Sequence, residues 1–322
     1  MSARPIVVKT DGLLEVEPGD VDVFAGQEVD FRERTCLTED ELVDACADAS
    51  GLLVLREPIT ARVLDALPAC RVVSRFGIGL DTIDVDAATR RGVQVTNVPA
   101  ANITEVAAHA VAMIMALTRR LPGYHDEVLA GGWNFRSPHG EIRRPGEQTV
   151  GLLGFGRIGR RVTAALTAVG FHVQVHDPGK PDDEVVAAGA RPAGADEVVE
   201  TSDVLSLHLP LTPRTRGILD AAALARTRPG VVVVNVSRGG LVDEEALADA
   251  VRRGHVAGAG LDTFAQEPLP ADSPLRGLPN VLLSPHAAHY SADSYQETRR
   301  TAFADVARVL RGEPPRHPVN RV

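Results

Sequence analysis

Residues 149–177 read TVGLLGFGRIGRRVTAALTAVGFHVQVHD and contain the pattern that decides the fold. An unbroken apolar run is followed by a glycine-rich turn, an amphipathic run at helical spacing that ends at Gly170, and a second β-rich run. The turn matches G-x-G-x-x-G, and an acidic residue follows about 20 positions later, at the end of the second β-rich run. This order predicts a strand–turn–helix–strand unit that binds a dinucleotide.

Each glycine of this turn has a distinct physical purpose. Gly154 permits a tight turn, Gly156 leaves room for a pyrophosphate against the backbone, and Gly159 lets the helix pack close to the strand. The helix then begins with N–H groups and a positive dipole end, so the backbone of Arg157 and Ile158 is expected to donate to phosphate oxygens. The alternative is a strand–helix turn with incidental glycines.

The acidic residue of the unit is Asp177. At this position a carboxylate accepts hydrogen bonds from the ribose hydroxyls and repels a 2′-phosphate, so NAD is favoured over NADP. Lys180 lies close by in sequence and weakens that preference slightly. The alternative for Asp177 is a turn-forming role before Pro178.

The rest of the chain alternates apolar strands with helical patterns, which predicts an α/β protein with two parallel sheets covered on both faces. A first set of strands closes at Asn97–Pro99. A long helix over Ile103–Leu121 and an irregular arm, GGWNFRSPHGEIRRPGEQ (131–148), precede the second set, which starts at Thr149. A last helix over Ser294–Arg311 is compatible with either domain.

The composition narrows the function. The 322 residues are 44% hydrophobic and carry a net charge of -9, which argues against nucleic-acid and membrane-surface partners. No apolar run reaches the roughly 20 residues that cross a bilayer, and MSARPIVVK lacks a secretory pattern. Three widely spaced cysteines, Cys36, Cys46 and Cys70, predict buried thiols rather than disulfides or a metal site. A cytoplasmic location is therefore expected.

Three charged or titratable residues follow strands of the second set. Arg238 follows VVVVNVS, Glu267 follows GLDTFAQ, and His286 follows VLLSP. Because the carboxyl ends of parallel strands share one edge, where ligands bind, we expect all three to lie near the reactive ring of the dinucleotide.

This set suits the reduction of a 2-keto acid. The Arg238 guanidinium can hold a carboxylate in a bidentate fork and polarise the carbonyl, His286 can act as general acid and base, and Glu267 can favour its charged form. The alternatives are a capping or surface arginine, a solvated loop acid and a structural histidine.

The chain resembles the D-2-hydroxyacid dehydrogenase family over nearly its whole length. The resemblance rests on these segments: RFGIGLDTIDVDAATRRGVQVTNVP (75–99), GLLGFGRIGRR (151–161), HDP (176–178), DVLSLHLPLTPRTRGIL (203–219), VNVSRGGLVDEEAL (234–247), AGAGLDTFAQEPLP (257–270) and LSPHAAHYS (283–291). It implies that Arg238, Glu267 and His286 form the catalytic set.

The resemblance also implies a fold and a wider site. A Rossmann nucleotide domain (100–289) would be inserted in a flavodoxin-like substrate domain (1–99 with 290–322), with a cleft between them. A homodimer would form through residues 103–148, where Trp133 is either an interface residue or a core residue. The further cofactor contacts are His208, Pro210, Thr215, Val236 and Asp262, with Asp262 facing the nicotinamide amide. The substrate contacts are Arg75, Gly77, Ile78 and Gly79, and Asn102 and Thr104 are expected near the cofactor.

Within the family, the chain looks most similar to the branch of C-terminal-binding proteins and phosphoglycerate dehydrogenases. His289 stands where the former have tryptophan, and it is expected either to reach the substrate or to lie on the surface. Arg75 suits a substrate with a second anionic group, whereas Glu57 is expected to repel a phosphate. The resemblance favours a reductase of a small 2-keto acid of phosphoglycerate, hydroxypyruvate, glyoxylate or phosphonate type. An NAD-sensing scaffold or corepressor is the alternative.

Overall fold

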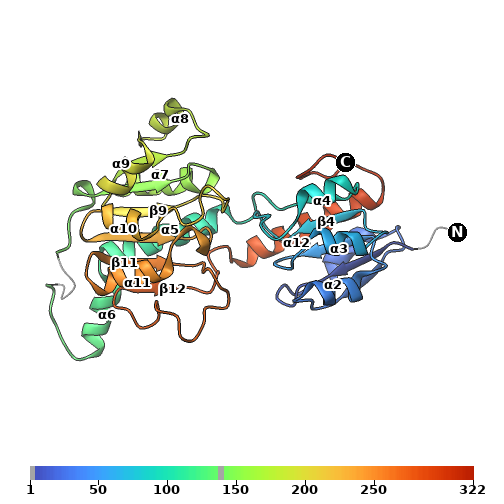
Figure 1. The fold of residues 1–322 in the computed structure, drawn as a ribbon, viewed down its shortest axis with the longest axis horizontal. Coiled ribbons are helices and arrows are strands. Elements are labelled where there is room, and N and C mark those ends of the chain that lie inside the picture. Colours follow the sequence, from blue (N-terminus) through green and yellow to red (C-terminus); the bar gives the residue numbers. More distant parts are fainter. Residues whose placement is uncertain (1–3, 137–140) are drawn as a thin grey trace. The chain divides into compact units, whose positions relative to one another are not determined.

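The computed structural model describes residues 4–136 and 141–322, so part of the arm over 131–148 lies outside the described residues. The chain forms two compact units, which are coloured along the sequence in Figure 1. Unit 1 consists of Met1–Asn102 and Ser291–Val322, and unit 2 consists of Ile103–Tyr290. Both ends of the chain therefore build unit 1, and the last helix belongs to it.

Unit 1 has a five-stranded parallel sheet in the order β2-β1-β3-β4-β5. This is the flavodoxin-like doubly wound order. Its strands are β1 (Ile6–Lys9), β2 (Asp30–Glu33), β3 (Gly51–Val54), β4 (Val72–Arg75) and β5 (Gln94–Thr96). Its helices are α1 (Pro18–Val21), the 3-10 turn η1 (Asp22–Phe24), α2 (Glu39–Cys46), α3 (Ala61–Ala66), α4 (Val85–Arg90) and α12 (Ala292–Leu310).

The sheet of unit 1 buries both faces, because successive strand residues point to opposite sides. Leu52 and Val54 belong to the core that includes buried residues of α2, α3 and α4. Leu53, between them, belongs to the core formed with Phe303 and other residues of α12. This is why GLLV reads as a continuous apolar run rather than an alternating one.

Unit 2 has a seven-stranded parallel sheet in the order β12-β11-β10-β9-β6-β7-β8. Its strands are β6 (Thr149–Leu153), β7 (His172–His176), β8 (Arg191–Pro192), β9 (Val204–Leu207), β10 (Val231–Asn235), β11 (Val256–Leu261) and β12 (Val281–Leu283). Its helices are α5 (Ile103–Thr118), α6 (Leu121–Leu129), η2 (Pro145–Glu147), α7 (Arg157–Val169), α8 (Asp182–Ala187), α9 (Ala195–Thr201), α10 (Ala221–Arg226), η3 (Gly239–Leu241) and α11 (Glu244–Arg252). The predicted fold class, with two doubly wound parallel-sheet domains, is confirmed.

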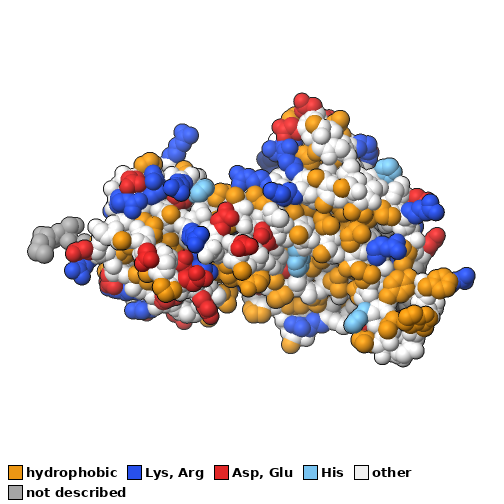
Figure 2. Space-filling model, turned by 180° about the vertical axis from the view of Figure 1, so that it is seen from behind, with side chains coloured by type: hydrophobic (Ala, Val, Ile, Leu, Met, Phe, Trp, Pro, Cys, Tyr) orange, Lys and Arg blue, Asp and Glu red, His pale blue; other side chains and the backbone are white. Residues whose placement is uncertain are grey.

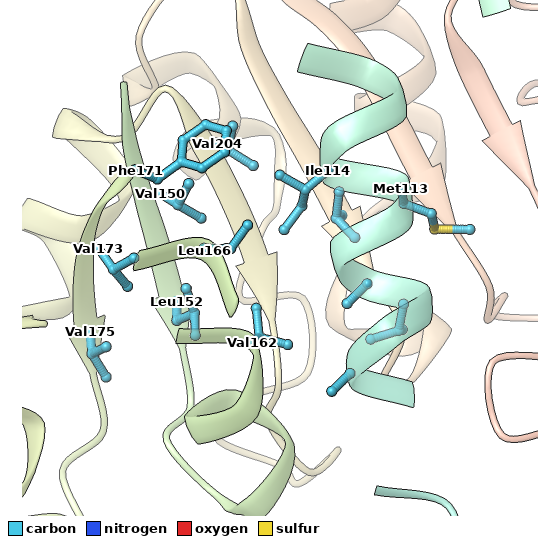
Figure 3. Packing of buried hydrophobic residues seen from close by; sticks show 14 of the residues in the cluster. Met113, Ile114, Val150, Leu152, Val162, Leu166, Phe171, Val173, Val175 and Val204 are labelled. Atoms are coloured by element: carbon cyan, nitrogen blue, oxygen red, sulfur yellow. The ribbon is translucent and has the colours of Figure 1, made fainter. Parts of the chain in front are cut away.

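Helices α5 and α7 pack together against one face of this sheet. Figure 3 shows Ile114 of α5 turned toward Leu166 of α7 and strand residues such as Val150, whereas Met113 points to the other side of the helix. A second core on the other face joins the strands to α9, α10 and α11. Helix α5 is thus a core helix of unit 2.

The predicted long helix ends earlier than expected. Arg120 adopts a left-handed backbone conformation with φ 57°, which ends α5 and allows α6 to begin at Leu121. Beyond α6, Trp133 is 91% exposed, so the alternative that Trp133 is a core residue is wrong. No helix in the described part of the chain combines the length and apolar character that crossing a bilayer requires.

The cysteines are buried in unit 1, as predicted. Cys36, Cys46 and Cys70 are free thiols in one hydrophobic core. Burial raises the pKa of Cys46 and of Cys70 to about 12. Both thiols therefore stay protonated at neutral pH and behave as apolar side chains.

A buried ion pair fastens α12 to the N-terminal segment of unit 1. The Arg299 Nε donates to Asp20 Oδ2 at 2.7 Å, and both residues are 5% exposed. Arg299 Nη2 also contacts Glu17, whose side chain is 60% exposed. Asp20→Ala would leave the buried guanidinium with only this exposed partner, so we expect a loss of about 3 kcal/mol in the free energy of unfolding. The exposed pair of Arg91 and Asp65 supplies the control. Asp65→Ala should cost less than about 1 kcal/mol, and equal losses in urea titrations would contradict this account.

Candidate functional site

The order of the strands in unit 2 reverses between β6 and β9. From β6 the chain runs outward through β7 and β8, and from β9 it runs the other way through β10, β11 and β12. Ligands of open parallel sheets bind at the carboxyl ends of the strands beside such a reversal. The glycine loop after β6 and His208 after β9 lie on either side of it.

The geometry of the glycine loop leaves no room for side chains at two of its three glycines. Gly154 has φ +101°, and a Cβ there would lie 2.4 Å from the carbonyl oxygen of His208. A Cβ at Gly159 would lie 2.5 Å from the carbonyl oxygen of Gly154. Gly156, by contrast, has nothing within 4 Å of a Cβ position and precedes the first residue of α7. The loop is thus closely packed at Gly154 and Gly159 and has open space at Gly156, where α7 begins.

The first turn of α7 starts with Arg157 and Ile158. The first N–H groups of an α-helix have no partner within the helix and carry its positive dipole end. Together with the open side of Gly156, this makes the start of α7 suitable for an anionic pyrophosphate.

Asp177 follows β7 and holds the glycine loop. Its Oδ2 accepts from the Phe155 N–H at 2.7 Å, and its Oδ1 accepts from the Gly179 N–H at 2.9 Å. The turn-forming role considered for this residue is therefore present. Each carboxylate oxygen keeps capacity for a second donor, so the contacts do not exclude ribose hydroxyls.

His208 is joined to the loop by its backbone and has an unusual ring environment. Its N–H donates to the Leu153 carbonyl at 2.8 Å, and its Nε2 lies 2.9 Å from Ser206 Oγ. Its Nδ1 is buried with no hydrogen-bond partner in the described part of the chain. Burial lowers the pKa of His208 from 6.5 to about 4, so the ring is neutral at pH 7.

The remaining predicted cofactor residues after β9 and β10 differ in exposure. Pro210 is exposed, and its carbonyl accepts from the Thr215 hydroxyl at 2.6 Å, which closes the loop between them. Val236 is buried at the end of β10. Thr215 thus shapes this loop.

Arg238 is half-buried directly after β10. Its Nη1 donates to the Ser237 carbonyl at 2.8 Å, and its own carbonyl accepts from the Asn235 side chain at 2.8 Å. The next residue, Gly239, is in close contact with the loop after β11, since a Cβ there would lie 1.8 Å from the Phe264 carbonyl carbon. The loop of Arg238 and the loop that leads to Glu267 are therefore neighbours.

Glu267 and His286 form the central contact of the site. Glu267 Oε2 lies 2.8 Å from His286 Nδ1, and Glu267 Oε1 accepts from the Phe264 N–H at 3.1 Å. The two side chains are 21% and 24% exposed, so the pair is partly shielded but still reachable. The carboxylate orients the ring and leaves Nε2 for a ligand.

Asp262 lies beneath His286. The resemblance implied that Asp262 faces the nicotinamide, and this stays a prediction. Its carboxylate is 1% exposed and accepts from the His286 loop. Its Oδ1 accepts from the Ser284 hydroxyl at 2.6 Å and from the Ala287 N–H at 2.8 Å. Its Oδ2 accepts from the Ala288 N–H at 2.9 Å.

Glu244 is a site residue that the sequence reasoning missed. Its Oε1 accepts from the Ala265 N–H at 2.6 Å, so it supports the loop that carries Glu267. Burial raises the pKa of Glu244, and the nearby Glu267 carboxylate adds to this shift. A signal was available, because Glu244 lies in the segment VNVSRGGLVDEEAL (234–247) that carries the resemblance, at the first position of α11.

The predicted substrate residues lie in unit 1, after β4. The Arg75 guanidinium covers Gly77, where a Cβ would lie 2.0 Å from Arg75 Nη1. Gly77 has φ +139°, and the neighbouring Ile78 carbonyl accepts from the Asn97 side chain at 2.9 Å. Gly79 is half-buried in the same loop. Asn102 ends the first segment of unit 1, whereas Thr104 is in the first turn of α5.

Glu57, which was expected to repel a phosphate, has a buried side chain. Glu57 is 7% exposed, and its Oε2 accepts from the Leu55 N–H at 2.6 Å and the Arg56 N–H at 3.0 Å. Burial also raises the pKa of this carboxyl. The side chain turns inward and shapes the turn after β3, which leaves Arg56 exposed.

His289 packs against His286. The two ring centroids are 5.8 Å apart with an interplanar angle of 84°, an edge-to-face contact. His289 is half-buried, and whether it reaches the substrate or lies on the surface stays a prediction. Its ring limits the space on one side of His286.

The residues present fit a dinucleotide. Gly156 has open space around it at the start of the 13-residue helix α7, and Asp177 follows the neighbouring strand β7. The carbonyl of His208 contacts the glycine loop, and the Nδ1 atom of the same residue is buried. These groups would hold the pyrophosphate and the adenosine ribose.

Comparison with known proteins identifies the family. Residues 111–288 match the family model described as D-isomer specific 2-hydroxyacid dehydrogenase, NAD binding domain. The chain is 42% identical to a D-3-phosphoglycerate dehydrogenase of Mycobacterium leprae, with 88% of the chain and 53% of that relative covered. It is 35% identical to a glyoxylate reductase of Korarchaeum cryptofilum, with 87% and 85% covered. The chain thus spans about half the length of its phosphoglycerate dehydrogenase relatives.

A solved structure gives the same result. The D-lactate dehydrogenase of Aquifex aeolicus, in complex with NAD and lactic acid, superimposes with a TM-score of 0.85 at 28% identity. The match covers 96% of each chain. The resemblance found in the sequence is confirmed, and the reported relatives lend no support to the scaffold alternative.

Burial of His208 makes the stability of unit 2 depend on pH. Below pH 6.5 the unfolded chain binds a proton at this residue, whereas the folded chain does so only near pH 4. Stability is therefore complete above pH 6.5 and falls as the pH drops toward 4, by up to about 3 kcal/mol. His208→Gln should flatten urea-derived unfolding free energies over this window, with exposed His125→Gln as the control. An unaltered slope in His208→Gln would contradict the assignment.

Proposed function

Since the chain belongs to the D-isomer specific 2-hydroxyacid dehydrogenase family, we propose that it transfers a hydride between NADH and a small 2-keto acid, forming a D-2-hydroxy acid. The observation that carries this proposal is the contact of 2.8 Å between Glu267 and His286, at the sheet edge that also bears the glycine loop. An imidazole held by a carboxylate is suited to general acid–base catalysis.

When bound, NADH supplies the hydride that adds to the carbonyl carbon of the substrate. His286 gives a proton from Nε2 to the carbonyl oxygen, because Nδ1 is occupied by Glu267. The Glu267 carboxylate lies 2.8 Å from Nδ1 and so fixes the orientation of the ring. In the reverse direction the same nitrogen accepts the hydroxyl proton.

Arg238 anchors the substrate carboxylate and polarises the carbonyl. A guanidinium presents two parallel donors to a carboxylate, which fixes the position of the adjacent carbonyl. Gly239 packs directly against the backbone of Phe264, so the loop that carries Arg238 and the loop that carries Glu267 stabilise each other. Glu244 stabilises the same loop from α11.

The substrate class follows from the residues of unit 1 and the relatives. Arg75 lies over Gly77, and Arg56 is exposed after the neighbouring strand. Two cations at one sheet edge suit a 2-keto acid that bears a second anionic group. The inward-facing Glu57 does not oppose such a group. Relatives named D-3-phosphoglycerate dehydrogenase and glyoxylate reductase support both the larger and the smaller substrate.

We further propose that the chain forms a homodimer through α6 and the arm that follows it. Leu129, Trp133 and Phe135 are 72%, 91% and 84% exposed. Figure 2 shows hydrophobic side chains gathered on unit 2, and a contiguous apolar surface of this kind marks an interface. The free thiols fit a reducing cytoplasm, where we place the protein.

Variants of His286 and Arg238 test the proposed catalysis. His286→Ala should lose turnover of 2-keto acids by at least about 100-fold while NADH still binds. Arg238→Lys should lower kcat/KM by about 100-fold or more, because one ammonium cannot replace a planar fork. The measurement is NADH absorbance with glyoxylate, hydroxypyruvate, phosphohydroxypyruvate and phosphonopyruvate, with NADH affinity followed by fluorescence. Normal turnover of Arg238→Lys would refute the anchoring role, and a wild type inactive with all four acids would refute the function.

Polar substitutions on the arm test the dimer. We expect the double variant Trp133→Ser, Phe135→Ser to weaken self-association by about 100-fold, because buried aromatic anchors dominate interface energies. Sedimentation equilibrium should show a dimer for the wild type and for the control Val186→Ser, an exposed residue of α8. A monomeric wild type would disprove the dimer.

A further inference from the structure

Helix α5 and strand β11 meet through a matched series of residues. A Cβ added at Gly258 would lie 3.2 Å from Leu117 Cδ2, and one at Gly260 would lie 3.0 Å from Met113 Cβ. His109 lies four residues before Met113 in α5, and Asp262 lies two residues after Gly260, directly after β11. Here His109 Nε2 lies 3.8 Å from Asp262 Oδ1.

The spacing of the two elements explains this series. Residues 258, 260 and 262 share one face of the strand, because strand side chains alternate. Residues 117, 113 and 109 share one face of the helix, because they are four apart. The two glycines let the helix approach closely, which brings the imidazole of His109 to the end of the strand.

His109 joins a hydrogen-bond network whose donors can be assigned. Asp262 accepts from the backbone N–H groups of Ala287 and Ala288, and from the Ser284 hydroxyl at 2.6 Å. Ser284 has thereby used its one proton. Its oxygen lies 3.0 Å from His109 Nε2, so His109 must be the donor in this contact. Both the neutral Nε2–H tautomer and the charged ring can provide this proton.

The network holds the backbone on which His286 depends. His286 has φ +55°, a conformation that residues with a Cβ rarely adopt. Its N–H donates to the Asp262 carbonyl at 2.8 Å and to the Ser284 carbonyl at 3.0 Å. The residues on both sides of this unfavourable backbone position are therefore tied to Asp262 and Ser284.

We propose that His109 is a positioning residue that acts on His286 through Ser284 and Asp262. By donating to Ser284, His109 fixes the direction of the serine proton toward Asp262. The carboxylate then keeps the 286–288 backbone in the conformation that points the His286 ring at Glu267. The effect on catalysis rests on the proposed function, whereas the effect on the loop does not.

The test compares two replacements of His109. His109→Leu removes the donor, and we expect kcat with a 2-keto acid to fall by about 10-fold to 100-fold, because small misplacement of a catalytic group is costly. The dissociation constant for NADH should stay unchanged. His109→Gln places an N–H near the position of Nε2 and should recover most of kcat. His172→Leu, an exposed histidine at the start of β7, should match the wild type.

Amide hydrogen exchange of residues 284–290 gives a readout that is independent of turnover. Exchange of the Ala287 and Ala288 amides should be at least 10-fold faster in His109→Leu than in His109→Gln and the wild type. Wild-type kcat in His109→Leu, equal losses in the two variants, or unchanged exchange would each overturn the proposal. If the wild type reduces no acid in the panel, the proposed function fails, and faster exchange in His109→Leu alone would still support the positioning role.

Discussion

The site depends on close backbone contacts between loops that follow neighbouring strands of one parallel sheet. Gly154 touches the His208 carbonyl, and Gly239 touches the backbone of Phe264. Neither contact leaves room for a Cβ, so the sequence of each loop determines how near the next one can lie. A parallel sheet brings the loops to one edge, and these contacts hold the glycine loop against His208 and the loop of Arg238 against the loop that leads to Glu267.

Much of this was predictable because the signals are local. The strand–glycine–helix pattern of residues 149–177 predicts its own geometry, and apolar runs predict strands that are buried on two faces. The topology of parallel sheets then predicts that Glu267 and His286 share an edge, since each follows a strand end.

Other features were beyond prediction because a residue type does not reveal the direction of its side chain. Glu57 was expected to face a ligand, but the N–H groups of Leu55 and Arg56 offered its carboxylate a nearer partner. The bond from the Ala287 N–H to Asp262 likewise could not be predicted from the position of this residue in the sequence. The break at Arg120 depends on a single left-handed residue, which no periodic pattern in the sequence indicates. In each case local backbone donors or dihedral angles determine the outcome.

The conformation of His286 explains why the site needs two carboxylates. A left-handed residue with a Cβ costs about 1–3 kcal/mol, and the flexible alternative, glycine, has no imidazole to transfer a proton. A hydrogen bond to a charged acceptor contributes about 1.5–3 kcal/mol, so the bonds from Ala287 and Ala288 to Asp262 are enough to offset that cost. Glu267 instead accepts from the His286 ring and the Phe264 N–H. One carboxylate therefore serves the backbone of the histidine and the other serves its ring.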